Sequence, residues 1–153
     1  MSKIVLTYGT FDLFHNGHLQ LLKRLRQLGD RLIVGVSTDE FNALKGKKTI
    51  IPFPERLEIV AALKYVDFAF AENCWEQKTR DIREHRVAVL GMGDDWRGKF
   101  DDYKPLCDVV YLPRTEGISS TQIKQSLSVL SRGHISEIKT SLDTIASIIE
   151  NLG

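Results

Sequence analysis

The sequence predicts an α/β protein built on a doubly wound, five-stranded parallel sheet with flanking helices and a C-terminal helical extension. Three observations support this class. Short apolar runs alternate with longer segments of helical periodicity from residue 3 to residue 113. The gaps between these runs are long enough for the helical crossovers that connect parallel strands. One run, RLIVGVS, is almost continuously apolar, as expected of a strand that helices cover on both faces.

The composition excludes several classes of function. The length of 153 residues fits one domain with its own core, and a net charge of +1 argues against a broad nucleic-acid-binding face. The first residues, MSK, lead into a strand without the apolar region of a signal peptide, and no run approaches a membrane span. With only two cysteines, we expect a cytoplasmic protein that neither binds nucleic acid nor inserts into a membrane.

The first strand is predicted over residues 3–8, where KIVLTY is apolar and rich in β-branched residues. A helix is expected from Gly17, because leucines recur along one helical stripe at positions 19, 22, 25 and 28. Gly29 follows a basic stretch, which is a typical helix end. The polar segment GTFDLFHNGH therefore lies between a strand and a helix.

The second strand is predicted over residues 31–37, the run RLIVGVS. A basic loop, KGKK at 45–48, and a proline-flanked turn, IPFP at 51–54, follow it. Pro54 suits the first turn of a helix, and the apolar spacing extends this helix to about Val66.

Three strands and one helix complete the predicted sheet. VDFAFA, VAVLGMG and DVVYLP are short apolar runs, which predict strands over residues 66–71, 87–93 and 108–113. Residues 75–86 are so rich in charge that we expect a polar surface helix there. The predicted fold is therefore a Rossmann-like α/β domain.

The C-terminal residues show a different pattern, from which we predict a first domain of residues 1–127 and a helical extension of residues 128–153. Apolar residues in the extension are spaced alternately by three and four positions, the seam of a coiled coil. They are Ile135, Ile138, Leu142, Ile145, Ile149 and Leu152. The seam is short, so a helix packed on its own domain remains an alternative to self-association. We take a homodimer interface as the hypothesis.

Four polar segments follow predicted strands directly. They are GTFDLFHNGH, the segment from STDEF to KGKK, GDDW and RTEGISST. The carboxyl ends of parallel strands meet at one edge of a sheet, and ligands bind there where the strand order reverses. The four segments therefore predict a single binding site.

His15 and His18 lie where the first helix is expected to begin. Unpaired N–H groups and the helix dipole at that position favour an anion, and imidazoles can donate hydrogen bonds to phosphate oxygens. A zinc site is an alternative, but it needs a third protein ligand, and His85 and His134 lie far along the chain. A solvated surface pair is the other alternative.

RTEGISST predicts a second helix N-terminus, because Ser119 and Gln122 have the spacing of a capping box. Arg114 lies just before it, which makes a second anion site. Two such sites at one edge suggest a polyphosphate.

The KGKK loop adds Lys45, Lys47 and Lys48 around Gly46. By itself this loop is typical of a solvated run of charge. Beside two phosphate sites, however, Gly46 suggests a hinge that lets the lysines close over a substrate. The acidic residues are ambiguous: Asp12, Asp94 and Asp95 could bind Mg²⁺, bond a ribose or cap a turn.

The first and last polar segments resemble the two signatures of a known family. GTFDLFHNGH is similar to G-x-F-D-x-x-H-x-G-H, and RTEGISST to R-T-x-G-[IV]-S-[ST]-T, of the cytidylyltransferases in the HxGH nucleotidyltransferase superfamily. Segments such as WEQK, MGDDW and VVYLPRTEGIS resemble the bacterial members that act on glycerol 3-phosphate, over residues 3–127. Lys64 departs from the pattern, since these enzymes often carry arginine there.

The resemblance implies a reaction in which an acceptor phosphate attacks the α-phosphorus of CTP in line and releases pyrophosphate. The expected acceptor is sn-glycerol 3-phosphate, which gives CDP-glycerol, a precursor of teichoic-acid or capsule-type polymers. Mg²⁺ or another divalent cation is expected to bind mainly through the CTP phosphates. Ribitol 5-phosphate, phosphoethanolamine or adenylyl transfer from ATP remain alternatives, as does a non-catalytic nucleotide-binding module.

The resemblance also implies residue roles. It assigns catalysis to His15, His18, Lys47 and Arg114, and binding of the acceptor phosphate to Lys45 and Lys78. The nucleotide-binding set comprises Gly9, Thr10, Phe11, Asp12, His15, Asn16, Gly17, His18, Lys47, Asp95, Arg114, Thr115, Glu116, Gly117, Ile118, Ser119, Ser120 and Thr121.

Overall fold

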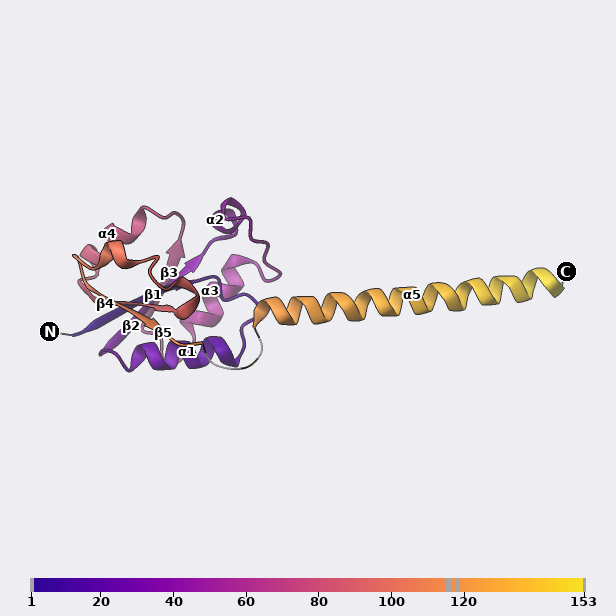
Figure 1. Cartoon of the computed structure of the whole chain (residues 1–153), viewed down its shortest axis with the longest axis horizontal. Coiled ribbons are helices and arrows are strands. Elements are labelled where there is room, and N and C mark those ends of the chain that lie inside the picture. The colour runs from indigo at the N-terminus through magenta and orange to yellow at the C-terminus, as the bar shows by residue number, and fades with distance from the viewer. Residues whose placement is uncertain (1, 115–116, 118, 153) are drawn as a thin grey trace. The chain divides into compact units, whose positions relative to one another are not determined.

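A computed structural model of the chain describes residues 2–114, 117 and 119–152, without the side chains of residues 129–132. It divides into two compact units, residues 1–117 and residues 118–153. The first unit is an α/β domain and the second is one helix, α5 (Ser120–Leu152), shown from orange to yellow in Figure 1. No helix of the described residues combines the length and apolar character that crossing a bilayer requires.

The first unit contains a five-stranded sheet in the order β3-β2-β1-β4-β5, and every pairing is parallel. The strands are β1 (Ile4–Gly9), β2 (Arg31–Ser37), β3 (Phe68–Glu72), β4 (Val87–Gly93) and β5 (Asp108–Leu112). The central strand is β1, from which the chain winds first to one side through β2 and β3 and then to the other through β4 and β5 (Figure 1). The predicted doubly wound parallel sheet is confirmed.

Four helices and two short 3-10 turns connect these strands. They are α1 (Asn16–Arg26), α2 (Asp39–Leu44), α3 (Phe53–Ala61), α4 (Gln77–Glu84), η1 (Asp94–Trp96) and η2 (Asp101–Tyr103). The short helix α2 was not predicted, although Thr38 caps it by accepting a hydrogen bond from the Phe41 N–H and two acidic residues lie in its first turn. These are ordinary helix-start signals that the polar character of the segment obscured.

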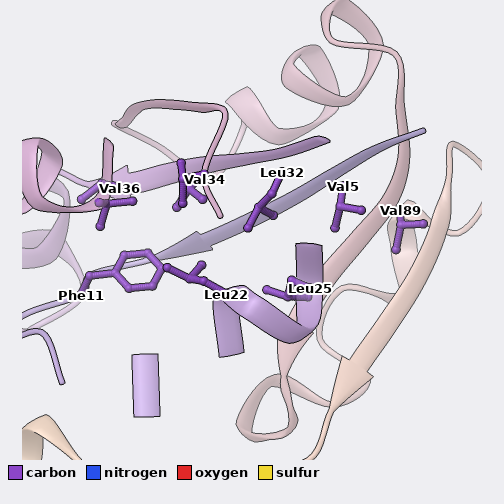
Figure 2. Close-up of a cluster of buried hydrophobic side chains, with 10 residues drawn as sticks. Val5, Phe11, Leu22, Leu25, Leu32, Val34, Val36 and Val89 are labelled. Carbon is purple, nitrogen blue, oxygen red and sulfur yellow. The ribbon is translucent and has the colours of Figure 1, made fainter. Parts of the chain in front are cut away.

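The core has two layers because side chains alternate across the central strand. Val5 points to the face covered by α1 and α3, where it packs with Leu22, Leu25 and Val60. Figure 2 shows this cluster, with the ring of Phe11 lying beyond Leu22 at the end of the layer that faces the strand termini. On the other face, Leu6 and Tyr8 pack with residues of α4 and of the η1–η2 region.

Two predictions about the middle of the chain are wrong. The helix that begins near Pro54 ends at Ala61 rather than near Val66, because the chain must turn at residues 62–67 to bring Phe68 beside Ile33 of β2. The helix over 75–86 is not a polar surface helix: α4 buries Gln77, Lys78, Asp81 and Ile82. Its buried polar groups bond to one another and to the sheet, which a pattern of charge along the sequence does not reveal.

The second unit is a continuous helix from Ser120 to Leu152, so it also spans the predicted boundary at residue 127. The predicted capping box at its start is confirmed, since the Ser119 N–H bonds to Gln122 Oε1 and the Gln122 N–H to Ser119 Oγ, both at 3.1 Å. All six seam residues from Ile135 to Leu152 are exposed within the chain.

Candidate active site

All five strands end at one edge of the sheet, which brings the polar segments after them together. The segments after β1, β2, β4 and β5 are those that the sequence singled out, and Glu72 at the end of β3 adds a fifth. The strand order reverses at β1, between β2 and β4. A doubly wound sheet binds its ligands at such a point, so we place the candidate site at the ends of these strands.

The turn after β1 has an unusual backbone. Phe11 and Leu13 have φ values of 56° and 49°, in the left-handed region that costs non-glycine residues about 1–2 kcal/mol. The carboxylate of Asp12 offsets this strain, because it accepts hydrogen bonds from the N–H groups of Ile50 and Ile51 at 2.9 Å each. Asp12 therefore ties the turn after β1 to the segment that follows the lysine loop.

Gly9 has a packing role in this turn. A Cβ at this position would lie 2.8 Å from two ring atoms of Phe11, which is buried beneath the turn. The resemblance placed Gly9 among the nucleotide-binding residues. The structure adds a packing reason for glycine at this position: Gly9 makes room for the ring that supports the histidine-bearing turn.

His15 and His18 form a reciprocal pair at the start of α1. His15 is the N-cap, and its Nδ1 accepts a hydrogen bond from the Gly17 N–H at 2.9 Å. His18 Nδ1 accepts from the His15 N–H at 3.2 Å, and the two ring centroids lie 4.0 Å apart. Because each Nδ1 is an acceptor, the proton of each neutral ring is on Nε2, which leaves two N–H donors at the helix N-terminus.

The surroundings of both imidazoles lower their pKa values and so favour the neutral form. Burial, with a further contribution from His15 when that ring is protonated, lowers the pKa of His18 to about 4. The rings of Phe11 and Phe14 provide much of that burial, with centroids 5.6 and 5.2 Å from that of His18. Burial and the positive charge of Arg114 also lower the pKa of His15, so the structure brings Arg114 close to this pair.

The lysine loop is set by the end of α2. The N–H of Lys47 bonds to the carbonyl of Asn42 at 2.8 Å and the N–H of Gly46 to that of Ala43 at 3.1 Å, the two bonds of a Schellman motif. Gly46 has a φ of 72°, as that motif requires. Lys45 is half-buried and Lys47 is exposed on either side of this glycine.

Arg56, which no motif in the sequence singles out, lies buried beneath the strand ends. It is 1% exposed, and its Nη1 donates to the carbonyls of Thr10 and Ser37 at 2.7 and 2.8 Å. Nε donates to the carbonyl of Ile51, and Nη2 pairs with Asp39. One guanidinium thus joins the ends of β1 and β2 to the segment after the lysine loop, and only its place inside a helix with apolar neighbours could have drawn attention to it.

A second buried polar cluster lies at the end of β3. Lys78 is 0% exposed and its Nζ is 2.5 Å from Glu72 Oε2, while Ser37 Oγ donates to Glu72 Oε1 at 2.5 Å. Lys45 Nζ donates to Ser37 Oγ at 3.3 Å. The ring centroids of Tyr8 and Trp75 lie 4.5 and 4.4 Å from Lys78 Nζ. Lys78, expected near the acceptor phosphate, is therefore buried beneath the ends of the strands and not exposed at the surface of the site.

The acidic residues after β4 have different settings. Asp94 bonds to Arg97 Nε at 2.7 Å, whereas the Asp95 side chain is exposed. Within the described part of the chain, no three His, Cys, Asp or Glu side chains gather as a metal site would require. The structure shows no protein-built metal centre among these residues.

The remaining predicted residues divide between the two units. Asn16 begins α1 and accepts a hydrogen bond from Gln20, and exposed Gly117 ends the first unit with a φ of 138°. Ser120 and Thr121 are the first residues of α5. The predicted nucleotide contacts Thr115, Glu116 and Ile118 lie outside the described residues.

Lys64, the departure from the family pattern, is exposed, and its Nζ lies 5.2 Å from the ring centroid of its neighbour Tyr65. Asp67, three residues further along, accepts a hydrogen bond from the Leu32 N–H at 2.8 Å and pairs with Arg26 at 3.3 Å. Arg26 therefore orients the Asp67 carboxylate.

Comparison with known proteins matches residues 6–126 to the cytidylyltransferase-like family model. The chain is 55% identical to a glycerol-3-phosphate cytidylyltransferase of Bacillus subtilis, across 84% of this chain and 99% of that protein. It is 50% identical to the protein of the same name from Staphylococcus aureus, across 82% and 95%. Among solved structures, a lipopolysaccharide core biosynthesis protein from Thermoplasma volcanium aligns with a TM-score of 0.65 at 25% identity, over 76% of this chain and all of that one.

Proposed function

The chain belongs to the cytidylyltransferase-like family, and from this premise we propose that it transfers the cytidylyl group of CTP to sn-glycerol 3-phosphate, with release of pyrophosphate. Relatives at 50–55% identity that carry this activity in their names support the choice of acceptor. A phosphate oxygen of glycerol 3-phosphate attacks the α-phosphorus of CTP, the bond from that phosphorus to the bridging oxygen breaks, and CDP-glycerol forms. No covalent enzyme intermediate is needed.

The observation that carries this proposal is the pair of neutral imidazoles at the N-terminus of α1. Two Nε2–H donors and the helix dipole favour the negative charge that builds on the α-phosphate oxygens in the transition state. A neutral donor suits this task because it stabilises that charge without giving up its proton. The backbone bonds to both Nδ1 atoms fix the tautomer before substrate arrives, so little reorganisation accompanies the reaction.

The cations around the histidines are assigned to the phosphates of both substrates. We assign Lys47 and Arg114 to the triphosphate. Lys47 is exposed on the loop after α2, and Arg114 is close enough to His15 for its charge to lower the pKa of that imidazole. Lys45 is assigned to the acceptor phosphate, with Lys78 beneath it. The segment from Gly9 to Phe11 and the residues around Gly117 and Ser119 are assigned to the nucleotide, and exposed Asp95 to its cytidine.

We assign the divalent cation to CTP rather than to the protein. Asp12 accepts several backbone hydrogen bonds and Asp94 is paired with Arg97, so neither carboxylate has the open geometry of a metal ligand. When present, Mg²⁺ supplies further neutralisation of the triphosphate charge. The roles of the protein's own residues are to bind, orient and donate hydrogen bonds.

The two units are assigned different tasks. The family match ends at residue 126, so most of α5 lies beyond the part of the chain that carries the chemistry. We propose that the exposed seam from Ile135 to Leu152 contributes to a homodimer, since its alternating spacing of three and four suits a partner helix. A cytoplasmic location remains a prediction of the sequence.

Pyrophosphate release tests the reaction directly. We would measure it with CTP, ATP, UTP and GTP against glycerol 3-phosphate, ribitol 5-phosphate and phosphoethanolamine, and identify the product by mass spectrometry. We expect release with CTP and glycerol 3-phosphate, and a product with the mass of CDP-glycerol. Absence of release with CTP and every acceptor would refute the proposal, and faster turnover with another acceptor would replace glycerol 3-phosphate.

A further inference from the structure

The ion pair between Glu72 and Lys78 is the most deeply buried charged contact near the site. The Glu72 side chain is 3% exposed and that of Lys78 is 0% exposed. Removing two charges from water is costly, and the cost is compensated only where the pair has good geometry and its remaining polar atoms are also bonded. Here both carboxylate oxygens are used, since Oε2 accepts from Lys78 and Oε1 from the Ser37 hydroxyl.

The same carboxylate also reaches a second lysine. Ser37 Oγ accepts a hydrogen bond from Lys45 Nζ and donates its own proton to Glu72, so a continuous chain runs from Lys45 through Ser37 and Glu72 to Lys78. Ser37 is itself buried at the end of β2, and Glu72 lies opposite it at the end of β3. The paired strand ends hold this chain in one geometry.

The groups that act on Lys45 are mostly cations. The positive groups that act on Lys45 are Lys47, Lys78 and Arg56, and the negative group is Glu72. Arg56 already pairs with Asp39, so among the groups that act on Lys45 the Glu72 carboxylate is left facing Lys47 and Lys78 as well as Lys45 itself. This predominance of cations around the half-buried Lys45 suits a substrate phosphate.

We propose that Glu72 is a positioning residue for the acceptor phosphate: it holds Lys78 beneath the site and, through the Ser37 hydroxyl, orients the ammonium of Lys45 toward the substrate. This inference rests on the proposed function and adds a residue to it. Glu72 does not touch the substrate in this scheme. Its effect passes through the two lysines, of which only Lys45 is partly open to solvent.

A simpler explanation, based on net charge alone, predicts the opposite change in the KM for glycerol 3-phosphate. If charge alone mattered, removing the carboxylate in Glu72→Gln would increase the positive excess and lower the KM for glycerol 3-phosphate. If Glu72 positions the lysines, its removal leaves Lys78 buried without a counter-charge and releases Lys45, and that KM rises. The sign of the change therefore separates the two.

A pH profile provides a second readout. Burial lowers the pKa of Lys45 to about 8, and the charge of Glu72 acts against that lowering. Lys47, Lys78 and Arg56 face Lys45 and push its pKa in the same direction as burial. In Glu72→Gln the pKa of Lys45 falls further, so the alkaline limb of kcat/KM for glycerol 3-phosphate moves to lower pH.

The experiment is steady-state kinetics on the full-length chain. We expect Glu72→Gln to raise the KM for glycerol 3-phosphate by at least about tenfold, with the KM for CTP within about twofold. Glu84→Gln is the matched control, because it makes the same carboxylate-to-amide change at an exposed position of α4 and should leave both constants unchanged. An unchanged or lowered KM for glycerol 3-phosphate, or an equal rise in both KM values, would overturn the proposal.

Ser37→Ala decides the matter if Glu72→Gln does not fold. This variant keeps the Glu72–Lys78 pair and removes only the link to Lys45, so the KM for glycerol 3-phosphate should rise by about threefold or more. No rise would overturn the positioning role. A wild-type chain that forms no CDP-glycerol would overturn the proposed function itself, whereas an active wild type with an unaffected Glu72→Gln would overturn only this inference.

Discussion

The backbone N–H of His15 donates a hydrogen bond to Nδ1 of His18, so the two candidate catalytic imidazoles are linked through the first residues of α1. Gly17 completes the arrangement by donating to Nδ1 of His15. This geometry determines which ring nitrogen carries the proton. It therefore connects helix capping, a structural function, to the two donors that the proposed reaction uses.

His15→Ala and His18→Ala should each lower kcat by at least about a hundredfold, the scale of removing one transition-state donor. Turnover of CTP and glycerol 3-phosphate measures this. His85→Ala is the control, because this imidazole stacks on Phe70 at the far end of α4 and should leave turnover near the wild-type value. Near-normal turnover in both site variants would remove the histidines from the mechanism.

The stability of the protein should fall as pH decreases from 6.5 toward about 4, and His18 should contribute to that fall. Burial lowers the folded-state pKa of His18, so in this range the unfolded chain binds more protons than the folded one. The contribution is complete above pH 6.5 and is lost toward the folded pKa. The free energy of unfolding, measured by chemical denaturation at several pH values in this range, should fall less steeply with decreasing pH for His18→Asn than for wild type. An identical pH dependence in the two proteins would contradict the assignment.

Arg56→Lys should destabilise the domain by about 2 kcal/mol or more, because a lysine cannot replace the separate bonds of the guanidinium to three carbonyls and Asp39. The free energy of unfolding from chemical denaturation measures this loss. Arg83→Lys, an exposed change on α4, should stay within about 0.5 kcal/mol of wild type. Equal stability of the two variants would show that the buried bonds of Arg56 contribute little.

Gly46→Ala should destabilise the chain by about 1 kcal/mol or more and raise the KM for both substrates, because alanine is strained at a φ of 72° and the flanking lysines would shift.

Gly133→Ala should change stability in the opposite direction. Gly133 lies inside α5 with open space around it, so alanine should stabilise that helix by about 0.5–1 kcal/mol. Thermal melting and kinetics measure both, and a neutral Gly46→Ala would argue against the role of the Schellman motif.

Deleting residues 128–153 should weaken self-association while leaving the α/β unit folded. Light scattering over a range of protein concentrations measures the mass. Leu142→Lys should act in the same direction because it places a charge in the seam, whereas Ser147→Lys on another face of α5 should have little effect. An unchanged mass with retained stability in the truncated protein would rule out the interface.

Much of the fold could be predicted from the sequence because its signals are local. Apolar runs such as RLIVGVS have strand length, and the leucine spacing after Gly17 has the helical period, so the order of these elements follows from neighbouring residues. The Ser119–Gln122 capping box was predicted for the same reason. The end of α3 was not, because the register of β3 against β2 decides where the chain must turn.

The sequence by itself determined the five-stranded α/β class, the two histidines at the start of α1 and the family. Only the tertiary structure decided that Arg56, Glu72 and Lys78 are buried beneath the site. Arg56 lies 46 residues from Thr10 and Glu72 lies 35 residues from Ser37, so their hydrogen bonds exist only after the crossovers bring the strand ends together. A sequence pattern records which residues are charged; the packing of distant segments decides which of those charges leave water and what they bond to.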